Sequence, residues 1–369
     1  MSMNFAFRVD SSAEIGTGHL GRCFTLAEKI VNAGHYVLFI CRHVPSNSVE
    51  MIKKSGCKLL KLDSQGDCAT QGDLSHSSWL GVEQSKDAIQ CIEGLDSLDI
   101  KLDWLIIDHY ALDFRWEKQL SLCTNNICVI DDLADRKHYC DLLVDQNFYN
   151  NPKSRYRHLV PPNCMLLLGP KYAILRDQFK NLKTSINNHD GKIKRIVIFF
   201  GGSDVNNFTG KAINALGNLS LDDVSIDVII GELHPDKQMI QRQCEKFKFV
   251  LYIQTSCIEA IFSASDLCIG GGGVSTWERC CLGLPTMIVA IAMNQIQIAK
   301  DLHDENGCIY LGDSLSVTEE IIQSKLEELF ANPSEVKDIS QNAYNLVDGL
   351  GAKRVLSILS NCNEHIDSN

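Results

Sequence analysis

Apolar residues in the first half of the chain fall into two alternating patterns. Short, mainly apolar runs predict buried β-strands at residues 5–9, 36–40, 57–62, 103–108, 127–130 and 141–144. Between them, apolar residues at helical spacing predict helices at residues 23–33, 48–55, 82–94 and 115–121. Continuous apolar strands interleaved with helices are typical of a parallel sheet with helices on both faces.

A second alternating series begins after a polar, unperiodic stretch at residues 181–192, which we interpret as a linker. Strands are predicted at residues 195–200, 224–230, 249–252, 266–269 and 286–289. Helices are predicted at residues 209–216, 259–264, 275–283, 294–306, 319–330 and 336–350. The expected fold class is therefore α/β, with two Rossmann-like domains (1–180 and 190–369) facing a central cleft. In such folds ligands bind outside the carboxyl ends of the strands.

Composition narrows the function classes. A length of 369 residues suits two domains, and a net charge of −11 argues against a general nucleic-acid binder. No apolar run is long enough for a membrane span, and the N-terminus lacks the features of a signal peptide. We read the 16 cysteines, among them Cys41, Cys128 and Cys268, as reduced core residues of a cytoplasmic protein. No Cys/His group has zinc spacing, so neither a metal nor another cofactor is expected.

The first chemical signal is the loop between the strand at 5–9 and the helix at 23–33. It contains Gly16 and Gly18 and ends on His19, where a helix N-terminus would favour an anion and a neutral imidazole. We predict that His19 is a general base. A helix-capping or packing role for His19 is the alternative, because this loop lacks the third glycine of a dinucleotide fingerprint.

The second signal is the run Gly270-Gly271-Gly272-Gly273 after a predicted strand, followed by Val274, Ser275, Thr276 and Glu278. Glycines let the backbone approach a ligand closely, and hydroxyls bind phosphate. The Glu278 carboxylate is predicted to accept hydrogen bonds from a ribose. Alternatively, Glu278 only complements the helix dipole.

Three weaker signals also lie at predicted strand ends. Gly201-Gly202-Ser203-Asp204 suits either a phosphate site or a plain turn. Asp108-His109-Tyr110 lies where site residues of α/β folds gather. Asp131-Asp132 either orients a base, binds sugar hydroxyls or caps the next segment. In addition, Asp10 is expected to steer Arg8, Arg22 or His19. His138, His158 and His303 lie in polar surroundings and are predicted to be surface residues.

Together these motifs resemble the nucleotide-sugar hydrolases of pseudaminic acid biosynthesis, which act on UDP-2,4-diacetamido-2,4,6-trideoxy-β-L-altropyranose. The resemblance covers about residues 5–310. The matching motifs, in order, are Arg8-x-Asp10, Gly16-x-Gly18-His19-x-x-Arg22, Trp79-Leu80-Gly81-Val82, Ile107-Asp108-His109-Tyr110, Ile130-Asp131-Asp132 with Asp135-Arg136, Cys140-Asp141-Leu142-Leu143, Gly169-Pro170-x-Tyr172-Ala173-x-Leu175-Arg176 and Gly201-Gly202-Ser203-Asp204.

The resemblance implies a glycosyltransferase-B-like fold whose C-terminal domain holds UDP and whose N-terminal domain holds the sugar. It also implies that His19 is the catalytic base. The substrate-binding residues that we predict are Arg8, Asp10, Gly16, Gly18, Arg22, Asp108, His109, Tyr110, Tyr172, Arg176, Gly202, Ser203, Asp204, Gly272, Gly273, Val274, Ser275, Thr276, Glu278 and Asn294.

The expected reaction uses water as the acceptor. His19 takes a proton from water as the water attacks the anomeric carbon, the C–O bond breaks with inversion, and UDP leaves without help from a metal. The alternatives are a glycosyltransferase of the same fold, a hydrolysing UDP-N-acetylglucosamine epimerase and a non-catalytic nucleotide-sugar sensor. The stereoisomer of the diacetamido sugar and the oligomeric state stay open. No nucleic-acid or membrane partner is expected.

Overall fold

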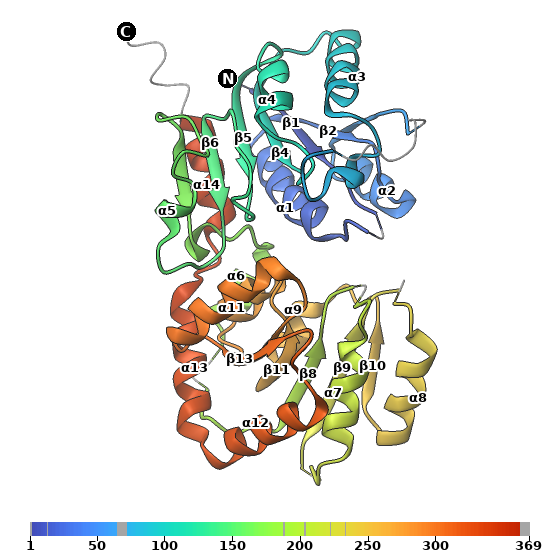
Figure 1. Ribbon diagram of the computed structural model, residues 1–369, viewed down its shortest axis with the longest axis vertical. Coiled ribbons are helices and arrows are strands. Elements are labelled where there is room, and N and C mark those ends of the chain that lie inside the picture. The colour runs from blue at the N-terminus through green and yellow to red at the C-terminus, as the bar shows by residue number, and fades with distance from the viewer. Residues whose placement is uncertain are drawn as a thin grey trace. The chain divides into compact units, whose positions relative to one another are not determined.

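The computed structural model describes residues 2–12, 14–64, 72–186, 189–202, 204–221, 223–232 and 234–361. The chain divides into two compact units (Figure 1). Unit 1 contains Met1–Asn147, Asn151–Ile174 and the C-terminal helix, and unit 2 contains Phe148–Asn150 and Leu175–Leu350. Each unit is a parallel sheet with helices on both faces, which confirms the predicted class of two Rossmann-like α/β domains.

The sheet of unit 1 has seven parallel strands in the order β3-β2-β1-β4-β5-β6-β7. They are β1 (Asn4–Val9), β2 (Tyr36–Cys41), β3 (Lys58–Lys61), β4 (Leu102–Asp108), β5 (Thr124–Ile130), β6 (Leu142–Asp145) and β7 (Met165–Leu168). The helices of unit 1 are α1 (Gly18–Asn32), α2 (Ser46–Lys54), η1 (Ser77–Leu80), α3 (Gln84–Ser97), α4 (Phe114–Leu120), α5 (Pro152–Arg155), η2 (Pro170–Tyr172) and α14 (Gly351–Asn361).

Side chains of this sheet alternate between two hydrophobic cores. Phe5 and Phe7 of β1 belong to the core that also holds residues of α1 and α14. Ala6 between them belongs to the opposite core, with residues of α3 and α4. Successive side chains of a strand point to opposite faces, so a strand that is apolar throughout must be covered on both sides.

The sheet of unit 2 has six parallel strands in the order β10-β9-β8-β11-β12-β13. They are β8 (Arg195–Phe199), β9 (Ser225–Ile230), β10 (Val250–Ile253), β11 (Leu267–Gly271), β12 (Thr286–Ala290) and β13 (Ile309–Asp313). The helices of unit 2 are α6 (Asp177–Lys183), α7 (Phe208–Gly217), α8 (Lys237–Phe247), α9 (Ile258–Ser263), α10 (Ser275–Cys281), α11 (Met293–Asp304), α12 (Glu319–Ala331) and α13 (Pro333–Leu346).

Both sheets reverse their strand order at one point, and the chemical motifs follow the strands at that point. In unit 1 the reversal lies between β1 and β4. Strand β1 precedes the loop that leads to His19, and strand β4 ends on Asp108. In unit 2 it lies between β8 and β11, which lead into the two glycine-rich loops. Ligands of open α/β sheets bind at such topological switch points.

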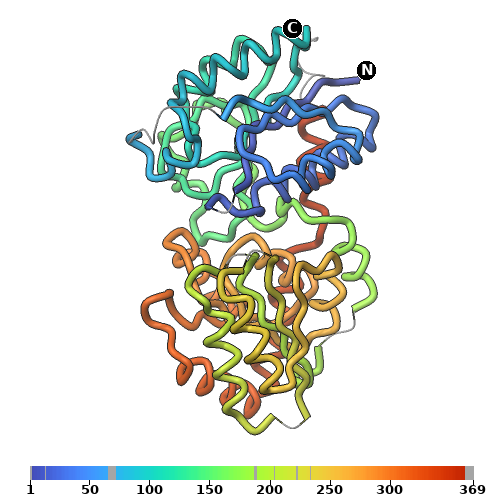
Figure 2. Tube along the Cα trace, turned by 90° about the vertical axis from the view of Figure 1, so that its right-hand side faces the viewer, coloured from blue at the N-terminus to red at the C-terminus, as the bar shows by residue number. Residues whose placement is uncertain are grey.

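The predicted domain boundaries differ from the observed units in two places. Helix α14 belongs to unit 1, where it packs against α1 and η2. Figure 2 shows this red segment beside the blue part of the chain. The indole N–H of Trp104 donates to the Leu359 carbonyl (2.9 Å), which ties β4 to α14. The predicted linker is also wrong, because α6, which includes residues 181–183, packs on α9 and α10 within unit 2.

Candidate active site

His19 and Asp108 form a hydrogen-bonded dyad at the switch point of unit 1. His19 is the second residue of α1, and its Nδ1 lies 2.6 Å from Oδ1 of Asp108, the last residue of β4. Because a carboxylate can only accept, this short contact favours the Nδ1–H tautomer of a neutral ring over a hydrogen bond from Arg22 Nη2, which lies 3.2 Å from the same nitrogen. Within the described part of the chain, Nε2 of His19 has no hydrogen-bond partner, and the side chain keeps 11% of its surface exposed. An imidazole held in this way has the arrangement of a general base oriented by a carboxylate.

Arg22 locks the carboxylate of the dyad in place. Its Nε donates to Oδ2 of Asp108 (2.6 Å) and its Nη2 donates to Oδ1 (2.7 Å). Burial alone raises the pKa of Asp108, but the charge of Arg22 and the His19 contact hold that pKa well below its usual range. Arg22 also donates to Asp132 (3.3 Å), which accepts a hydrogen bond from the Tyr110 hydroxyl. Asp132 thus contacts the arginine that holds the dyad, and the roles expected for Asp132 stay predictions.

Arg8, Asp10 and His109 lie together, but in the framework behind the dyad. Arg8 donates to both oxygens of Asp10 (2.8 and 3.0 Å) and both oxygens of Asp87 (3.1 and 2.8 Å), and its side chain is fully buried. Asp10 also accepts from the Arg42 backbone N–H (2.7 Å). His109 contacts Asp10 through Nε2 (3.2 Å) and accepts at Nδ1 from a backbone N–H (3.2 Å). Because these groups are occupied by one another, we reassign them from substrate binding to holding β1, β2 and α3 together.

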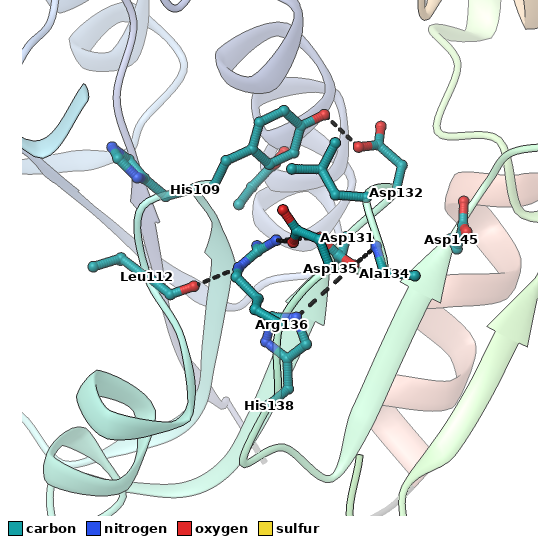
Figure 3. Close-up of polar contacts among 12 residues, drawn as sticks. His109, Leu112, Asp131, Asp132, Ala134, Asp135, Arg136, His138 and Asp145 are labelled. Atoms are coloured by element: carbon teal, nitrogen blue, oxygen red, sulfur yellow. Dashed lines mark hydrogen bonds and ion pairs between the residues drawn. The ribbon is translucent and has the colours of Figure 1, made fainter. Parts of the chain in front are cut away.

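A second buried polar cluster follows β5 and β6 (Figure 3). Arg136 donates to Asp131 (2.8 Å) and to the Leu112 carbonyl (2.8 Å). His138, which we predicted to be a surface residue, is instead buried, with Nδ1 2.7 Å from Oε1 of Glu117. Burial disfavours its charged form, yet Glu117 and Asp131 raise the pKa of His138 to about 9.

Asp145 belongs to the same cluster, and the sequence analysis did not single it out. It is the last residue of β6, and its Oδ2 accepts from the Tyr156 hydroxyl (3.0 Å). Burial and then the negative charge of Asp132 raise the pKa of Asp145 to about 7. The signal available in the sequence was its position at the end of a strand.

Gly16, Gly18 and Tyr172 lie outside the buried polar clusters described above. Gly16 adopts a φ of 79°, a conformation that favours glycine, and its N–H donates to the Ser12 carbonyl (2.8 Å). Gly18 is exposed and begins α1. Tyr172 is half-buried at the end of η2, where it packs against the core that contains α14.

Close packing explains why most positions of the glycine run in unit 2 are occupied by glycine. A Cβ on Gly270 would lie 2.3 Å from the Phe199 carbonyl oxygen of the neighbouring strand. A Cβ on Gly271 or Gly272 would lie 3.3 or 3.2 Å from a side chain that packs over the loop. Only Gly273 has room, since its nearest neighbour would be 3.8 Å away. Close packing against the neighbouring strand therefore accounts for Gly270 without a ligand.

Arg279 ties the loop after β11 to the first turn of α10. It is buried and donates to the Gly271 carbonyl (2.7 Å), to the Thr276 hydroxyl (3.1 Å) and to the Ser275 hydroxyl (3.1 Å). Both hydroxyl oxygens accept a hydrogen bond, so their own O–H groups stay available as donors. The sequence analysis missed Arg279, although its spacing of three and four residues from the two hydroxyls is helical.

Glu278 is within electrostatic range of Arg176. Burial raises the pKa of the Glu278 carboxyl, and the positive charge of Arg176 opposes that rise. Arg176 donates to Oε2 of Glu259 (2.9 Å). Val274 precedes α10, and half-buried Asn294 is the second residue of α11.

Asp204 is held at the start of α7. Its carboxylate accepts from the backbone N–H groups of Phe208 (3.0 Å) and Thr209 (2.7 Å), which begin α7. The Asp204 carboxylate is therefore engaged at the start of α7, beside the N-cap Asn207, and its substrate role stays a prediction. Gly202 is exposed, and a Cβ there would meet nothing within 4 Å. Ser203 lies outside the described residues.

The described residues contain neither a metal-binding group nor a membrane-spanning helix. No group of three or more His, Cys, Asp or Glu residues there could hold a metal ion. No helix there is long and apolar enough to cross a membrane.

The fold and part of the sequence match known glycosyltransferases. Residues 196–354 match the model of the glycosyltransferase family 28 C-terminal domain. Among solved structures, MurG of Acinetobacter baumannii is similar, with a TM-score of 0.65 and 13% sequence identity over 98% of this chain and 99% of that one. The fold class is thus glycosyltransferase-B-like, as the sequence analysis expected.

Three curated proteins are related in sequence at low identity. An uncharacterized protein of Methanocaldococcus jannaschii is 25% identical over 82% of this chain but only 58% of its own length. The spore coat polysaccharide biosynthesis protein SpsG of Bacillus subtilis is 24% identical over 72% of this chain and 78% of its own. The UDP-2,4-diacetamido-2,4,6-trideoxy-β-L-altropyranose hydrolase of Campylobacter jejuni is 26% identical over 65% of this chain and 74% of its own.

Proposed function

We propose that the protein hydrolyses a UDP-linked diacetamido-trideoxy sugar, releasing UDP and the free sugar for pseudaminic-acid-type biosynthesis. The His19–Asp108 dyad carries the proposal, because the 2.6 Å bond at Nδ1 leaves Nε2 without a partner in the described chain. The relative from Campylobacter jejuni, named for this hydrolysis, supports the choice of substrate class.

The proposed reaction follows from the hydrogen bonding of His19, whose Nδ1 is bound to Asp108 and whose Nε2 is free to accept a proton. Nε2 of His19 removes a proton from water as the water oxygen bonds to the anomeric carbon. The pair of electrons in the bond from that carbon to the diphosphate oxygen leaves with UDP. Asp108, held by Arg22, stabilises the imidazolium that forms. Direct attack by water predicts inversion at the anomeric carbon.

In this proposal, unit 2 binds the UDP part of the substrate. The Ser275 and Thr276 hydroxyl groups have O–H donors to offer a diphosphate, since Arg279 occupies only their acceptor sites. The Glu278 carboxylate, near Arg176, is proposed to accept hydrogen bonds from the ribose hydroxyls.

A glycosyltransferase is the second candidate, favoured by the family 28 match over residues 196–354. One experiment separates the two functions. The protein is incubated without any acceptor with a panel of UDP- and CMP-linked sugars, and ¹H NMR follows the first anomer to form. Release of UDP and an inverted free sugar supports hydrolysis. Sugar release that requires an added acceptor supports transfer instead.

A further inference from the structure

An aromatic cluster surrounds the proposed base. Its members are His19, Tyr110, Trp79, which belongs to the motif Trp79-Leu80-Gly81-Val82 but was given no role, and His76, which no motif includes. The Trp79 ring stacks on Tyr110 with centroids 5.5 Å apart and planes 24° apart. His76 lies edge-on to Trp79 at 4.6 Å and tilted to Tyr110 at 5.2 Å. His19 meets Tyr110 edge-on at 4.5 Å and Trp79 at 6.2 Å.

His76 contributes an unpaired polar atom to this cluster. Its Nδ1 is buried and has no hydrogen-bond partner in the described part of the protein. Burial lowers the pKa of His76, so the ring is neutral near pH 7. A buried nitrogen left unpaired costs about 1–3 kcal/mol, and native proteins usually satisfy such an atom with a water or a ligand.

Trp79 differs from the other tryptophans in its exposure. The chain has four tryptophans, and Trp104, Trp116 and Trp277 are almost completely buried. Trp79 is half-buried and so keeps part of its indole surface open beside the dyad. Small-molecule sites combine such aromatic surface with a few polar atoms that fix the orientation of the ligand.

We propose that His76 and Trp79 are the sugar-recognition residues of unit 1, a statement that rests on the proposed function. Trp79 packs on an apolar substituent of the sugar, an acetamido methyl group or the 6-deoxy carbon. His76 Nδ1 forms a hydrogen bond with a hydroxyl or an acetamido group. Neither residue takes part in bond breaking. The ligand class is an N-acetylated deoxy sugar carried on UDP.

Tryptophan fluorescence tests the proposal directly. Acrylamide quenches exposed indoles, so Trp79 is expected to supply the quenchable emission and Trp79→Phe to abolish it. The measurement uses a His19→Asn background, which keeps the nucleotide sugar intact. UDP-2,4-diacetamido-2,4,6-trideoxy-β-L-altropyranose is expected to shield Trp79 from acrylamide, and UDP alone is not. Unchanged quenching with the nucleotide sugar at ten times the Kd of UDP overturns the proposal.

Binding measurements on variants in the same background give a second readout. The sugar contribution is the Kd of UDP divided by the Kd of the nucleotide sugar, by calorimetry. Trp79→Ala and His76→Ala are each expected to lower this ratio by about tenfold while the Kd of UDP stays constant. Ser78→Ala, an exposed change in the same segment, and Phe114→Leu, on an aromatic side chain 41% exposed, serve as controls. A ratio that is unchanged in both test variants also overturns the proposal.

The two proposals fail in different ways. Shielding of Trp79 without any hydrolysis by the wild-type protein rejects the hydrolase function and keeps the recognition site. Hydrolysis by the wild-type protein without shielding in the His19→Asn background rejects the recognition site alone.

Discussion

Residues around the dyad differ in what they can offer a substrate, although all lie near the switch point of unit 1. His19 keeps a nitrogen free, whereas Arg8 and Asp10 have their polar atoms occupied by one another. Four residues chosen from the sequence, His19, Arg22, Asp108 and Tyr110, lie together in the structure. The sequence could not separate framework residues from candidate site residues, because that depends on which partner each charge finds across the sheet. Arg8 pairs with Asp87, which lies 79 residues away in the chain.

Asp108→Asn tests the orientation of the base. An amide cannot stabilise the imidazolium and permits the wrong tautomer of His19, so kcat for UDP-sugar hydrolysis is expected to fall about 10³–10⁴-fold. The Kd of UDP should not change. Asp99→Asn is the control, since Asp99 is exposed with a φ of 51°, which asparagine tolerates. An Asp108→Asn enzyme with normal kcat would contradict the role of the dyad.

His138 predicts a pH dependence of stability. Its pKa is about 9 in the folded protein and about 6.5 in an unfolded chain. The raised pKa means that the stabilisation is complete below about pH 6.5 and disappears as the pH rises through about 9. In urea unfolding, the free-energy gap between wild type and His138→Gln should therefore shrink from pH 6 to pH 9.5. A gap that stays constant or widens would show that His138 is not charged when folded.

Elements were predicted best where the apolar pattern was continuous. Six of the seven strands of unit 1 were expected within a few residues, and most of them carry buried residues on both faces. Strand β7 was not expected as a strand. Helices α8 and α14 and strand β13 are among the elements that were missed. Only Ile240 and Cys244 of α8 and only Ile309 of β13 are buried, so these two elements offer few buried positions from which to recognise them.

The glycine run after β11 yields a matched pair of variants. Gly270→Ala places a methyl group 2.3 Å from the Phe199 carbonyl oxygen and should destabilise unit 2 by roughly 1–3 kcal/mol. Gly273→Ala has space and should leave the free energy of unfolding within about 0.5 kcal/mol of wild type. If this loop binds UDP, Gly273→Ala should still weaken UDP binding about tenfold by removing a close backbone contact. Calorimetry showing normal UDP affinity would remove the loop from the site.

At the scale of the whole molecule, the chain returns to unit 1 after completing unit 2. Periodicity identified two α/β domains, but it could not show that the last helix belongs to the first of them. That assignment comes from packing: Val355 and Leu359 of α14 are fully buried in the core shared with β1 and α1. A boundary drawn from sequence order alone fails when a domain is discontinuous.

Leu359→Ala tests this return of the chain. The cavity left by the side chain should destabilise unit 1 by about 2–5 kcal/mol. Hydrogen exchange should increase in α1 and β4 but not in α7. Leu122→Ala, in the same unit but on a side chain 89% exposed, should change stability by less than about 0.5 kcal/mol. Faster exchange confined to unit 2 would contradict the assignment of α14.

The measurement that tests the central claim most directly compares wild type and His19→Ala on the UDP-linked diacetamido-trideoxy sugar, with no acceptor present. NMR follows release of the sugar, and calorimetry gives the Kd of UDP. Loss of a general base predicts that kcat falls by at least about 100-fold while the Kd of UDP stays nearly unchanged. Equal losses of turnover and UDP affinity, or unimpaired turnover, would contradict the assignment of His19 as the base.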